Sequence, residues 1–544
     1  MATVKIPKKL IAECIKLTPD LAEKISLMGV PVESENQEEL EIEVLPNRPD
    51  VLSIQGFLRV LKAYSGKEPG LKRYKINAPE KDYKVKVDSS LKEIRPYTAC
   101  AIVKNLKFDD DKIKEIIDLQ EKLHITLGRN RKRFAIGIYP LEKITLPIKF
   151  EARKPKEIKF IPLEMDRVLT GLEILQKHPA GRNYAKLLEG LSKYPVFVDA
   201  KGKILSMPPI INSHETGKIT ANTREVFIEC SGSDLNSLKK TLNIIVTTLA
   251  DMGGKIFAME VDYGKKEIMP DLSPEKIKIS LDNANSLLGV ELKEKDLQKL
   301  LPKMGYDYDK GRVLIPAWRT DILHEVDIIE DIAIAYGYDK LPHKIPQVST
   351  IAEESPMTKL QSRIARVLTG LGLLEISTYH LIKEEERIIA KLKEEQKIEL
   401  ENSKTEYKLL RPNLVIPALR IFSENKDNEY PQRIFELGTV FSLDKTGNTE
   451  TGIKEKESLL IACSPANFTE LKQILDYLAR MLKLDYELRE EKKDGFIEGR
   501  TGSILINGGE CGFIGEAHPE MLRQWGIKMP ICLIEINIDG LLAE

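Results

Sequence analysis

The stretch IPAWRTDILHEVDIIEDIAIAYGYDKLP, residues 315–342, gathers acidic side chains between apolar ones. At about 100° per residue, a helix would align one apolar stripe toward the core. That stripe consists of Ile322, Val326, Ile329, Ala333 and Tyr336. Asp327, Glu330 and Asp331 fall on another face. Asp321 lies near the start, where a carboxylate can cap a helix and favour its positive end. The pattern therefore predicts an amphipathic helix with one acidic face.

Two interpretations of the acidic face follow from the residues. One is a solvated face with a good N-cap. The other is a cation site, because carboxylates three or four residues apart repel each other by a few tenths of a kcal/mol per pair. A cation would remove that cost, and oxygen-only ligands suit a hard ion such as Mg²⁺. The residues alone leave both interpretations open.

The composition limits the class of protein. The chain has 544 residues, so three to five domains are expected. Its hydrophobic content of 42% and net charge of −1 are those of a globular protein without a global basic field. The six cysteines form no C-x-x-C pair, and no apolar run approaches the roughly 20 residues that span a bilayer. We expect a cytoplasmic protein with no membrane partner.

The order of helix and strand patterns predicts a multidomain α/β and α+β chain. Residues 1–82 form an N-terminal α/β domain, and residues 83–265 form a second α/β domain. Residues 266–345 combine two short helices, a hairpin and the acidic helix, which is a winged-helix-like arrangement. Residues 346–544 form a last domain with strands and helices. Within the second domain, DLNSLKKTLNIIVTTLADMG (234–253) predicts a helix capped by Asp234.

The acidic stretch resembles the metal-binding module in the β subunit of phenylalanyl-tRNA synthetase, of the archaeal and eukaryotic type. The matching positions are Pro316, Arg319, Asp321, Asp327, Glu330, Asp331, Tyr336, Gly337 and Tyr338. In that family the corresponding acids bind Mg²⁺ at the junction with the α subunit. The resemblance therefore implies four metal ligands: Asp321, Asp327, Glu330 and Asp331.

The segment MPPIINSHETGKI (207–219) resembles part of the family's editing-like module, which hydrolyses tyrosine wrongly attached to the tRNA. An editing pocket must recognise the phenol hydroxyl by a polar contact. The candidate pocket residues are Pro209, Asn212, Ser213, His214, Glu215 and Thr216. A polar loop after a hairpin is the alternative, and no catalytic base is assigned.

A basic run lies in LGRNRKRFAIGIY (127–139). It contains Arg129, Arg131, Lys132 and Arg133, which are candidates for contacts with tRNA phosphates. A solvated basic strand end explains the run equally well.

Two further segments are similar to the same family. In VLPNRPDVLSIQGFLRVLKAYSG (44–66), Asn47, Arg48 and Asp50 look functional, although such a cluster also caps a following helix. The segment LLRPNLVIPALRIFSENKDNEYPQRIFELGTVF (409–441) resembles the signature of a class II synthetase-like domain, an antiparallel sheet with helices that lacks catalytic residues. Arg411 stands at the signature's arginine, but Pro412 and Asn413 replace its usual small polar residues.

The resemblance implies a β subunit that takes part in ATP-dependent attachment of phenylalanine to tRNA(Phe). The α subunit would carry the main active site in an (αβ)₂ heterotetramer. This chain would supply scaffold, Mg²⁺-linked contact and editing. No Walker loop occurs, which favours ATP chemistry on the partner. The alternative is a non-enzymatic nucleic-acid-binding or scaffold protein. A DNA reader should line its recognition helix with basic or amide side chains, so the acidic helix disfavours that alternative.

Overall fold

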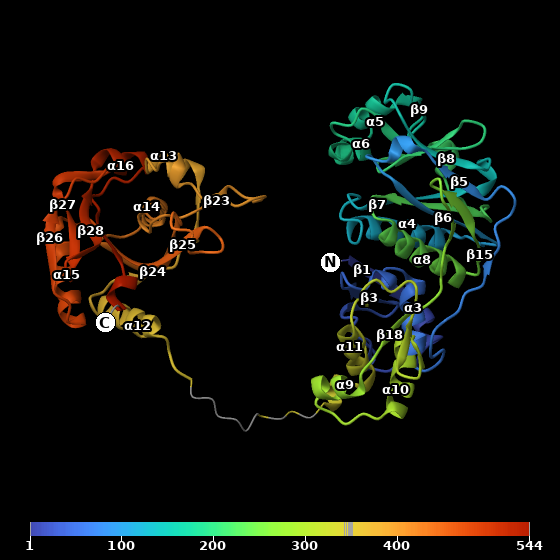
Figure 1. Ribbon diagram of the computed structural model, residues 1–544, viewed down its shortest axis with the longest axis horizontal. Helices are drawn as coiled ribbons and strands as arrows, with labels where there is room; N and C mark the ends of the chain where they lie inside the picture. The colour runs from blue at the N-terminus through green and yellow to red at the C-terminus, as the bar shows by residue number, and fades with distance from the viewer. Residues whose placement is uncertain (1, 342, 344, 346–351, 543–544) are drawn as a thin grey trace. The chain divides into compact units, whose positions relative to one another are not determined.

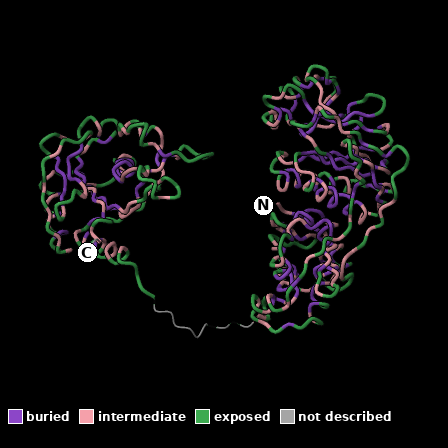
Figure 2. The backbone as a smooth tube through the Cα atoms, viewed as in Figure 1, coloured by how far each residue is buried: buried purple, intermediate pink, exposed green. Residues whose placement is uncertain are grey.

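The structure is a computed structural model that describes residues 2–341, 343, 345 and 352–542 (Figure 1). It divides into two compact units, Met1–Ile345 and Pro346–Glu544. Each unit has buried hydrophobic clusters of its own, which are seen as buried stretches of the tube in Figure 2. The predicted start of the last domain, residues 346–351, lies outside the described residues.

The first unit begins with an antiparallel sheet in the order β1 (Ala2–Pro7), β3 (Glu39–Val44) and β2 (Val32–Glu35). Alternating apolar and acidic residues in β3 bury Leu40, Ile42 and Val44 on one face, as its sequence predicts. Three helices pack near this sheet: α1 (Lys8–Ala12), α2 (Leu21–Ser26) and α3 (Ile54–Tyr64). The helix α3 is capped by the hydroxyl of Ser53, which accepts the N–H of Gly56.

Two larger sheets follow. The five-stranded sheet has the order β4 (Ile76–Asn77), β15 (Lys255–Phe257), β6 (Tyr97–Lys104), β14 (Val226–Gly232) and β7 (Phe134–Pro140). The seven-stranded sheet has the order β13 (Ile211–Asn212), β12 (Ile204–Met207), β11 (Tyr194–Val198), β8 (Ile148–Arg153), β5 (Lys84–Val87), β16 (Met259–Asp262) and β17 (Lys266–Met269). The strand β4 lies before residue 82 and β17 lies after residue 265, so these sheets extend past both predicted domain boundaries.

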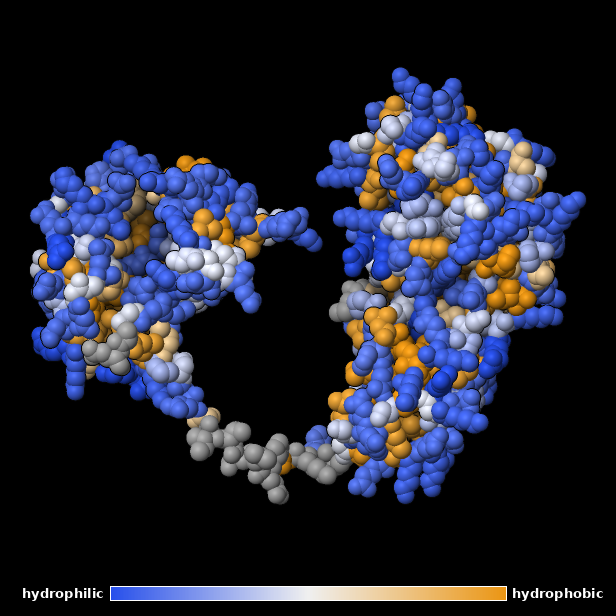
Figure 3. Space-filling model, viewed as in Figure 1, coloured by the Kyte–Doolittle hydropathy of each residue, from blue (hydrophilic) through white to orange (hydrophobic). Residues whose placement is uncertain are grey.

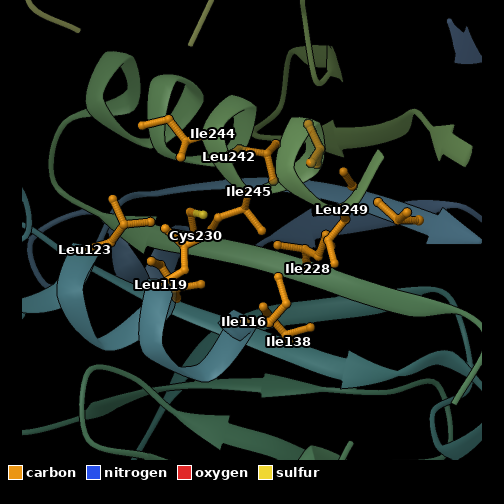
Figure 4. Close-up of a cluster of buried hydrophobic side chains, with 14 of the residues drawn as sticks. Ile116, Leu119, Leu123, Ile138, Ile228, Cys230, Leu242, Ile244, Ile245 and Leu249 are labelled. Atoms are coloured by element: carbon orange, nitrogen blue, oxygen red, sulfur yellow. The ribbon is translucent and has the colours of Figure 1, made fainter. Parts of the chain in front are cut away.

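Two long helices, α4 (Asp110–Ile125) and α8 (Leu235–Asp251), lie side by side against the five-stranded sheet (Figure 1). Asp234 caps α8 through the N–H of Asn236, as predicted. Figure 4 shows their side chains converging on β7 and β14, where Ile138, Ile228 and Cys230 project toward the helices. Since side chains alternate along a strand, Glu229, which lies between Ile228 and Cys230, projects to the opposite face of the sheet.

A small lobe is inserted between β8 and β11. It holds β9 (Lys159–Phe160), β10 (Leu169–Thr170), α5 (Gly171–Lys177) and α6 (Pro179–Tyr184). The predicted hairpin that follows is present as β11 and β12, with one irregularity in register after Phe197. The loop after β12 leads through β13 into the short helix α7 (His214–Gly217).

The rest of the first unit is a compact module. Its antiparallel sheet has the order β18 (Glu275–Lys278), β20 (Arg312–Ile315) and β19 (Asp307–Asp309). Its helices are α9 (Leu281–Leu288), α10 (Glu294–Leu300), the 3₁₀ helix η5 (Leu301–Met304) and α11 (Glu325–Tyr336). The two short helices, the hairpin and the acidic helix expected from the sequence are all present.

The second unit is built on a seven-stranded sheet. Its order is β21 (Leu374–Glu375), β24 (Gln432–Leu443), β25 (Ile453–Ser464), β29 (Cys532–Asn537), β28 (Gly509–Ala517), β27 (Phe496–Ile506) and β26 (Tyr486–Glu490). All pairs are antiparallel except β21 with β24. The turn between β27 and β28 uses Asn507 and Gly508, both at positive φ, as their order in the sequence suggests.

Helices cover both faces of this sheet. One cluster includes residues of α12 (Pro356–Gly370) and α15 (Phe468–Leu482). The other includes residues of α14 (Val415–Glu424) and α16 (Pro519–Gln524). The neighbours Ile434 and Phe435 belong to different clusters, as do Leu533 and Ile534. A small pair of strands, β22 (Leu381–Lys383) and β23 (Tyr407–Leu410), and α13 (Glu384–Ile389) complete the unit.

The surface seen in Figure 3 is mostly hydrophilic, with separate hydrophobic patches on each unit. Among the described residues, we find no helix with the length and apolar character needed to cross a membrane.

Candidate functional site

The acidic helix begins later than the sequence pattern suggested. The helix α11 starts at Glu325, and His324 is its N-cap, with Nδ1 accepting the N–H of Val326 at 3.3 Å. The carboxylate of Asp327 reaches back and accepts the N–H groups of Leu323 and His324, both at 2.8 Å. The expectation that Asp321 caps the helix is therefore wrong. Asp327 thus accepts hydrogen bonds from free N–H groups at the start of the helix. Asp321 instead binds Arg319.

The buried face of α11 is also wider than one stripe. Ile328, Ile329, Ile332, Ala333 and Ala335 are buried. Val326, expected in the core, is 48% exposed because it lies in the first turn at the edge of the module. Asp331, expected on the outer face, is buried and only 5% exposed. Packing on two sides of the helix therefore encloses one of the four acids.

The partner of the buried acid is Arg319, which is itself 3% exposed. Its Nε and Nη2 donate to the two carboxylate oxygens of Asp321 at 2.8 and 2.6 Å. The same Nη2 donates to Asp331 at 2.8 Å, and the hydroxyl of Tyr306 also donates to Asp331. Burial opposes the charge of Arg319, but the nearby carboxylates outweigh it and raise its pKa well above the ordinary value.

The four predicted ligands do not fit a Mg²⁺ site within this chain. The residues that the structure describes, which include all four acids, hold no group of three or more acidic, histidine or cysteine side chains placed for a metal. Both oxygens of Asp321 are occupied by Arg319. A divalent ion about 4 Å from a guanidinium would be repelled by roughly 8 kcal/mol at an effective dielectric of 20. Of the four acids, Glu330 is the exposed one.

A cavity of about 460 Å³ opens in the second domain, beside β7 and the segment after β12. Its wall includes residues of α4, of β7 and of the Pro208–Asn212 segment, together with Glu229 from β14. This volume is within the usual range for sites that hold a small molecule.

Three of the six predicted pocket residues line this cavity, namely Pro209, Asn212 and His214. The others are placed elsewhere. Ser213 is buried, and its backbone N–H donates to the carbonyl of Leu205 at 2.7 Å. Thr216 is buried beside the same carbonyl, and exposed Glu215 pairs with Lys203. These three residues stabilise the loop, and none of them lines the cavity.

The cavity wall contains an acid that the sequence motifs did not reveal. Glu229 is 1% exposed, and its Oε2 has no hydrogen-bond partner among the described residues. Its Oε1 accepts the hydroxyl of Tyr139 at 3.2 Å. Burial raises the pKa of Glu229 to about 8, although the charge of Arg95 opposes the shift. The sequence feature that could have revealed Glu229 is its position as the single acid within the apolar strand VFIECSG (226–232).

The basic run does not act as one patch. Arg129 and Lys132 are exposed, and Arg133 pairs with Asp234 at 3.5 Å. Arg131 is mostly buried, so it does not fit the predicted phosphate contact. Its Nη1 donates to the carbonyls of Pro209 and Ile210 at 3.2 and 2.9 Å. It therefore holds the rim of the cavity.

Further contacts fix Arg131 in place. Its Nη2 donates to Glu121 at 2.8 Å, and its guanidinium stacks 4.5 Å above the ring centre of Tyr184. Arg129, Asn130 and Arg131 have φ values of 49°, 53° and 63°. The left-handed region costs a residue with a side chain roughly 1–2 kcal/mol. A run of three such residues persists because the clamp of Arg131 and the turn's backbone hydrogen bonds offset that cost.

Two other motifs are structural in this chain. Arg48 and Asp50 form a buried bidentate pair with both distances at 2.9 Å, while Asn47 is exposed. The cap of the next helix is Ser53, so the capping alternative for Asp50 is wrong. In the second unit, Arg411 is buried and donates to Glu436 at 2.8 Å and to the hydroxyl of Thr378 at 2.7 Å.

Comparison with known proteins places these features in a family. Family models match the phenylalanyl-tRNA synthetase beta chain CLM domain over residues 341–538, the tRNA synthetase B5 domain over residues 277–338 and the B3/4 domain over residues 94–246. The cavity residues lie largely in the B3/4 match and the acidic helix in the B5 match. These matches and the arrangement of sheets define a chain of the aminoacyl-tRNA synthetase class.

Relatives identify the family within that class. The phenylalanine–tRNA ligase β subunit of Thermococcus sibiricus is 39% identical over 90% of this chain and 88% of its own. That of Archaeoglobus fulgidus is 35% identical over 95% and 94%. A solved N-terminal fragment of the phenylalanyl-tRNA synthetase β subunit from Pyrococcus horikoshii is 37% identical, with a TM-score of 0.58 over 61% of this chain and 99% of the fragment. The chain belongs to the family of phenylalanine–tRNA ligase β subunits.

Proposed function

We propose that this chain takes part, with an α subunit, in the ATP-dependent attachment of phenylalanine to tRNA(Phe). Family membership over nearly the whole chain supports this role. The α chain would form the adenylate and transfer phenylalanine, and this chain would supply scaffold and editing. An (αβ)₂ heterotetramer and a cytoplasmic location stay predictions from the family resemblance.

The editing part of the proposal is carried by one observation. Glu229 lines a cavity large enough for an aminoacyl group, and its buried Oε2 has no hydrogen-bond partner among the described residues. A buried polar atom without a partner costs about 1–3 kcal/mol. A substrate hydroxyl that reaches it regains that energy, whereas a phenyl ring leaves it unpaired. The cavity would therefore favour tyrosine over phenylalanine.

The neighbours of Glu229 sharpen this selectivity. At neutral pH the raised pKa keeps the carboxyl mostly protonated, so it can donate to a phenol oxygen. The hydroxyl of Tyr139 lies within hydrogen-bond distance of both Glu229 Oε1, at 3.2 Å, and Asn212 Oδ1, at 3.3 Å. A site that forms a hydrogen bond with a substrate hydroxyl discriminates against the substrate without that hydroxyl far more strongly than a site that selects by pocket size alone. We assign no catalytic base.

Deacylation assays of the complex test this proposal. Hydrolysis of Tyr-tRNA(Phe) and Phe-tRNA(Phe) would be compared for the parent, Glu229→Ala and the control Glu215→Ala. Glu215 is exposed and outside the cavity wall. We expect Glu229→Ala to lower the preference for the tyrosyl substrate by about tenfold or more, as loss of one buried hydrogen bond predicts. Equal hydrolysis of both substrates by the parent would refute the editing role.

A Mg²⁺ ion shared with the α subunit also stays a prediction. The geometry supports only a site that uses fewer of the four acids, because Arg319 already binds Asp321 and Asp331. Glu330 is exposed, and Asp327 is half-buried at the start of α11. Mg²⁺ commonly keeps several waters and needs few protein carboxylates. Any such site would therefore depend on Glu330 and on groups of the α chain.

A further inference from the structure

We propose that Asp321 and Asp331 are the acidic members of a buried, charge-balanced arginine network, with Arg319 in the place that the family resemblance gives to a metal ion. The network joins three parts of the first unit, namely the segment around α3, the end of α8 and the module that carries α11. This inference does not depend on the editing proposal.

The turn that carries Arg319 is held from outside its own module. Lys240 of α8 donates its Nζ to the carbonyl of Arg319 at 3.1 Å. Asn243 of the same helix donates to the carbonyl of Ala317 at 3.1 Å. These contacts hold the backbone of the segment that carries Arg319 against α8. Asp321 and Asp331 then bind the guanidinium itself.

Two further ion pairs lie beside Arg319. Arg48 binds Asp50 through two hydrogen bonds of 2.9 Å. Arg59 of α3 binds Asp251, at the end of α8, at 3.2 Å. Arg48, Asp50, Arg59 and Arg319 line one cavity of about 30 Å³, together with Lys72 and Trp318. The guanidinium of Arg59 lies 4.7 Å from the ring centre of Trp318, next to Arg319 in the chain.

The charges in this network cancel. Its five cations are Arg48, Arg59, Arg319, Lys62 and Lys72, and Lys72 contacts Asp251 at 3.0 Å. Its five anions are Asp50, Asp251, Asp321, Asp331 and Glu68, a residue of the cavity wall that lies 3.2 Å from Lys62 and 3.7 Å from Lys72. A divalent ion bound by Asp321 and Asp331 would leave two uncompensated positive charges beside the buried Arg319, which is strongly unfavourable. The network is complete without a metal.

The small cavity gives the network one opening for solvent. The Nη1 and Nη2 atoms of Arg59 are buried and have no partner among the described residues. A volume of about 30 Å³ holds one or two waters, which would satisfy these donors.

Thermal unfolding of the full chain in EDTA and in excess Mg²⁺ tests the proposal. The variants are Asp331→Asn and Asp321→Asn, with Glu330→Gln as a matched control on the same helix. We expect both Asp→Asn changes to lower the midpoint by about 5 °C or more, by the same amount in EDTA and in Mg²⁺. Glu330→Gln should leave the midpoint within about 1–2 °C of the parent.

A second measurement keeps the test decisive if an Asp→Asn chain does not fold. Binding of Mn²⁺, as a probe for Mg²⁺, would be followed by electron paramagnetic resonance on the parent and on Arg319→Lys. We expect no tight Mn²⁺ site in the parent chain that depends on Asp321 or Asp331. A tight Mn²⁺ site in the parent chain, or a parent midpoint that rises with Mg²⁺ and falls with EDTA, would overturn the proposal.

Discussion

The hydroxyl of Tyr139 donates to Oε1 of Glu229 at 3.2 Å, across two neighbouring strands of the five-stranded sheet. The residue paired with Glu229 in the register of β7 and β14 is Gly137. A Cβ atom at Gly137 would lie 2.2 Å from the hydroxyl of Tyr139 and 2.5 Å from Glu229 Oε1. Glycine is therefore what allows the phenol and the carboxyl to meet.

Gly137→Ala should consequently displace Tyr139, Glu229 or both. We expect the selectivity of deacylation for Tyr-tRNA(Phe) to fall by about tenfold, while phenylalanine charging by the complex is unchanged. Gly370→Ala is the control, since a Cβ at Gly370 meets nothing within 4 Å. Retained selectivity in Gly137→Ala would contradict the proposed role of this pair.

Glu229 should also give the fold a defined pH dependence. Its pKa is about 8 in the folded chain, against about 4.5 for an exposed Glu. Between these values the folded state keeps a proton that the unfolded state has lost. Stability should therefore fall as pH rises through this window, by up to about 1.4 kcal/mol per pH unit, and level off above pH 8. Urea unfolding from pH 5 to 9 measures this slope, which Glu229→Gln should reduce.

Arg131 should shape the cavity without binding phosphate. Arg131→Ala removes the clamp on the carbonyls of Pro209 and Ile210, so we expect a higher KM for deacylation of Tyr-tRNA(Phe) by about tenfold or more. Lys132→Ala, at an exposed neighbour, is the control. The salt dependence of tRNA binding separates the two roles, because a phosphate contact would lower its slope and a clamp would not. A reduced slope in Arg131→Ala would restore the phosphate interpretation.

The second unit should not activate phenylalanine alone. Its arginine at the family signature, Arg411, is buried and bound to Glu436 and Thr378. It is therefore not exposed to a nucleotide. We expect ATP–pyrophosphate exchange by the purified chain at background level, and exchange after addition of the α subunit. Exchange by this chain alone at the rate of the complex would disprove the assignment.

Glu330 is the acid on which a shared Mg²⁺ ion would depend. Glu330→Gln should weaken association with the α subunit and remove its dependence on Mg²⁺, while the fold stays intact. Titration calorimetry of the two chains at several Mg²⁺ concentrations measures this effect. Asp282→Asn, at an acid in the first turn of α9, serves as a charge-matched control. An affinity without Mg²⁺ dependence in the parent favours a solvated acidic face.

Local patterns in the sequence determined much of the fold. The alternation in β3, the capped helix α8, the hairpin of β19 and β20 and the turn at Asn507 all follow from neighbouring residues. Each depends on interactions within a few positions, such as side-chain period, a cap or a turn conformation. The family resemblance likewise depended on motifs that are contiguous in the chain.

Tertiary packing decided the chemistry of the acids. Helical periodicity treated Asp331 as an outer residue, yet Tyr306, just before β19, and Arg319, in the segment after β20, enclose it. Glu229 stood outside every motif, and its environment comes from Tyr139, ninety residues away. Burial and charge pairing depend on which distant segments meet. The sequence by itself therefore predicted the elements and the family, whereas only the assembled sheets and helices determined which carboxylates are neutralised, buried or exposed.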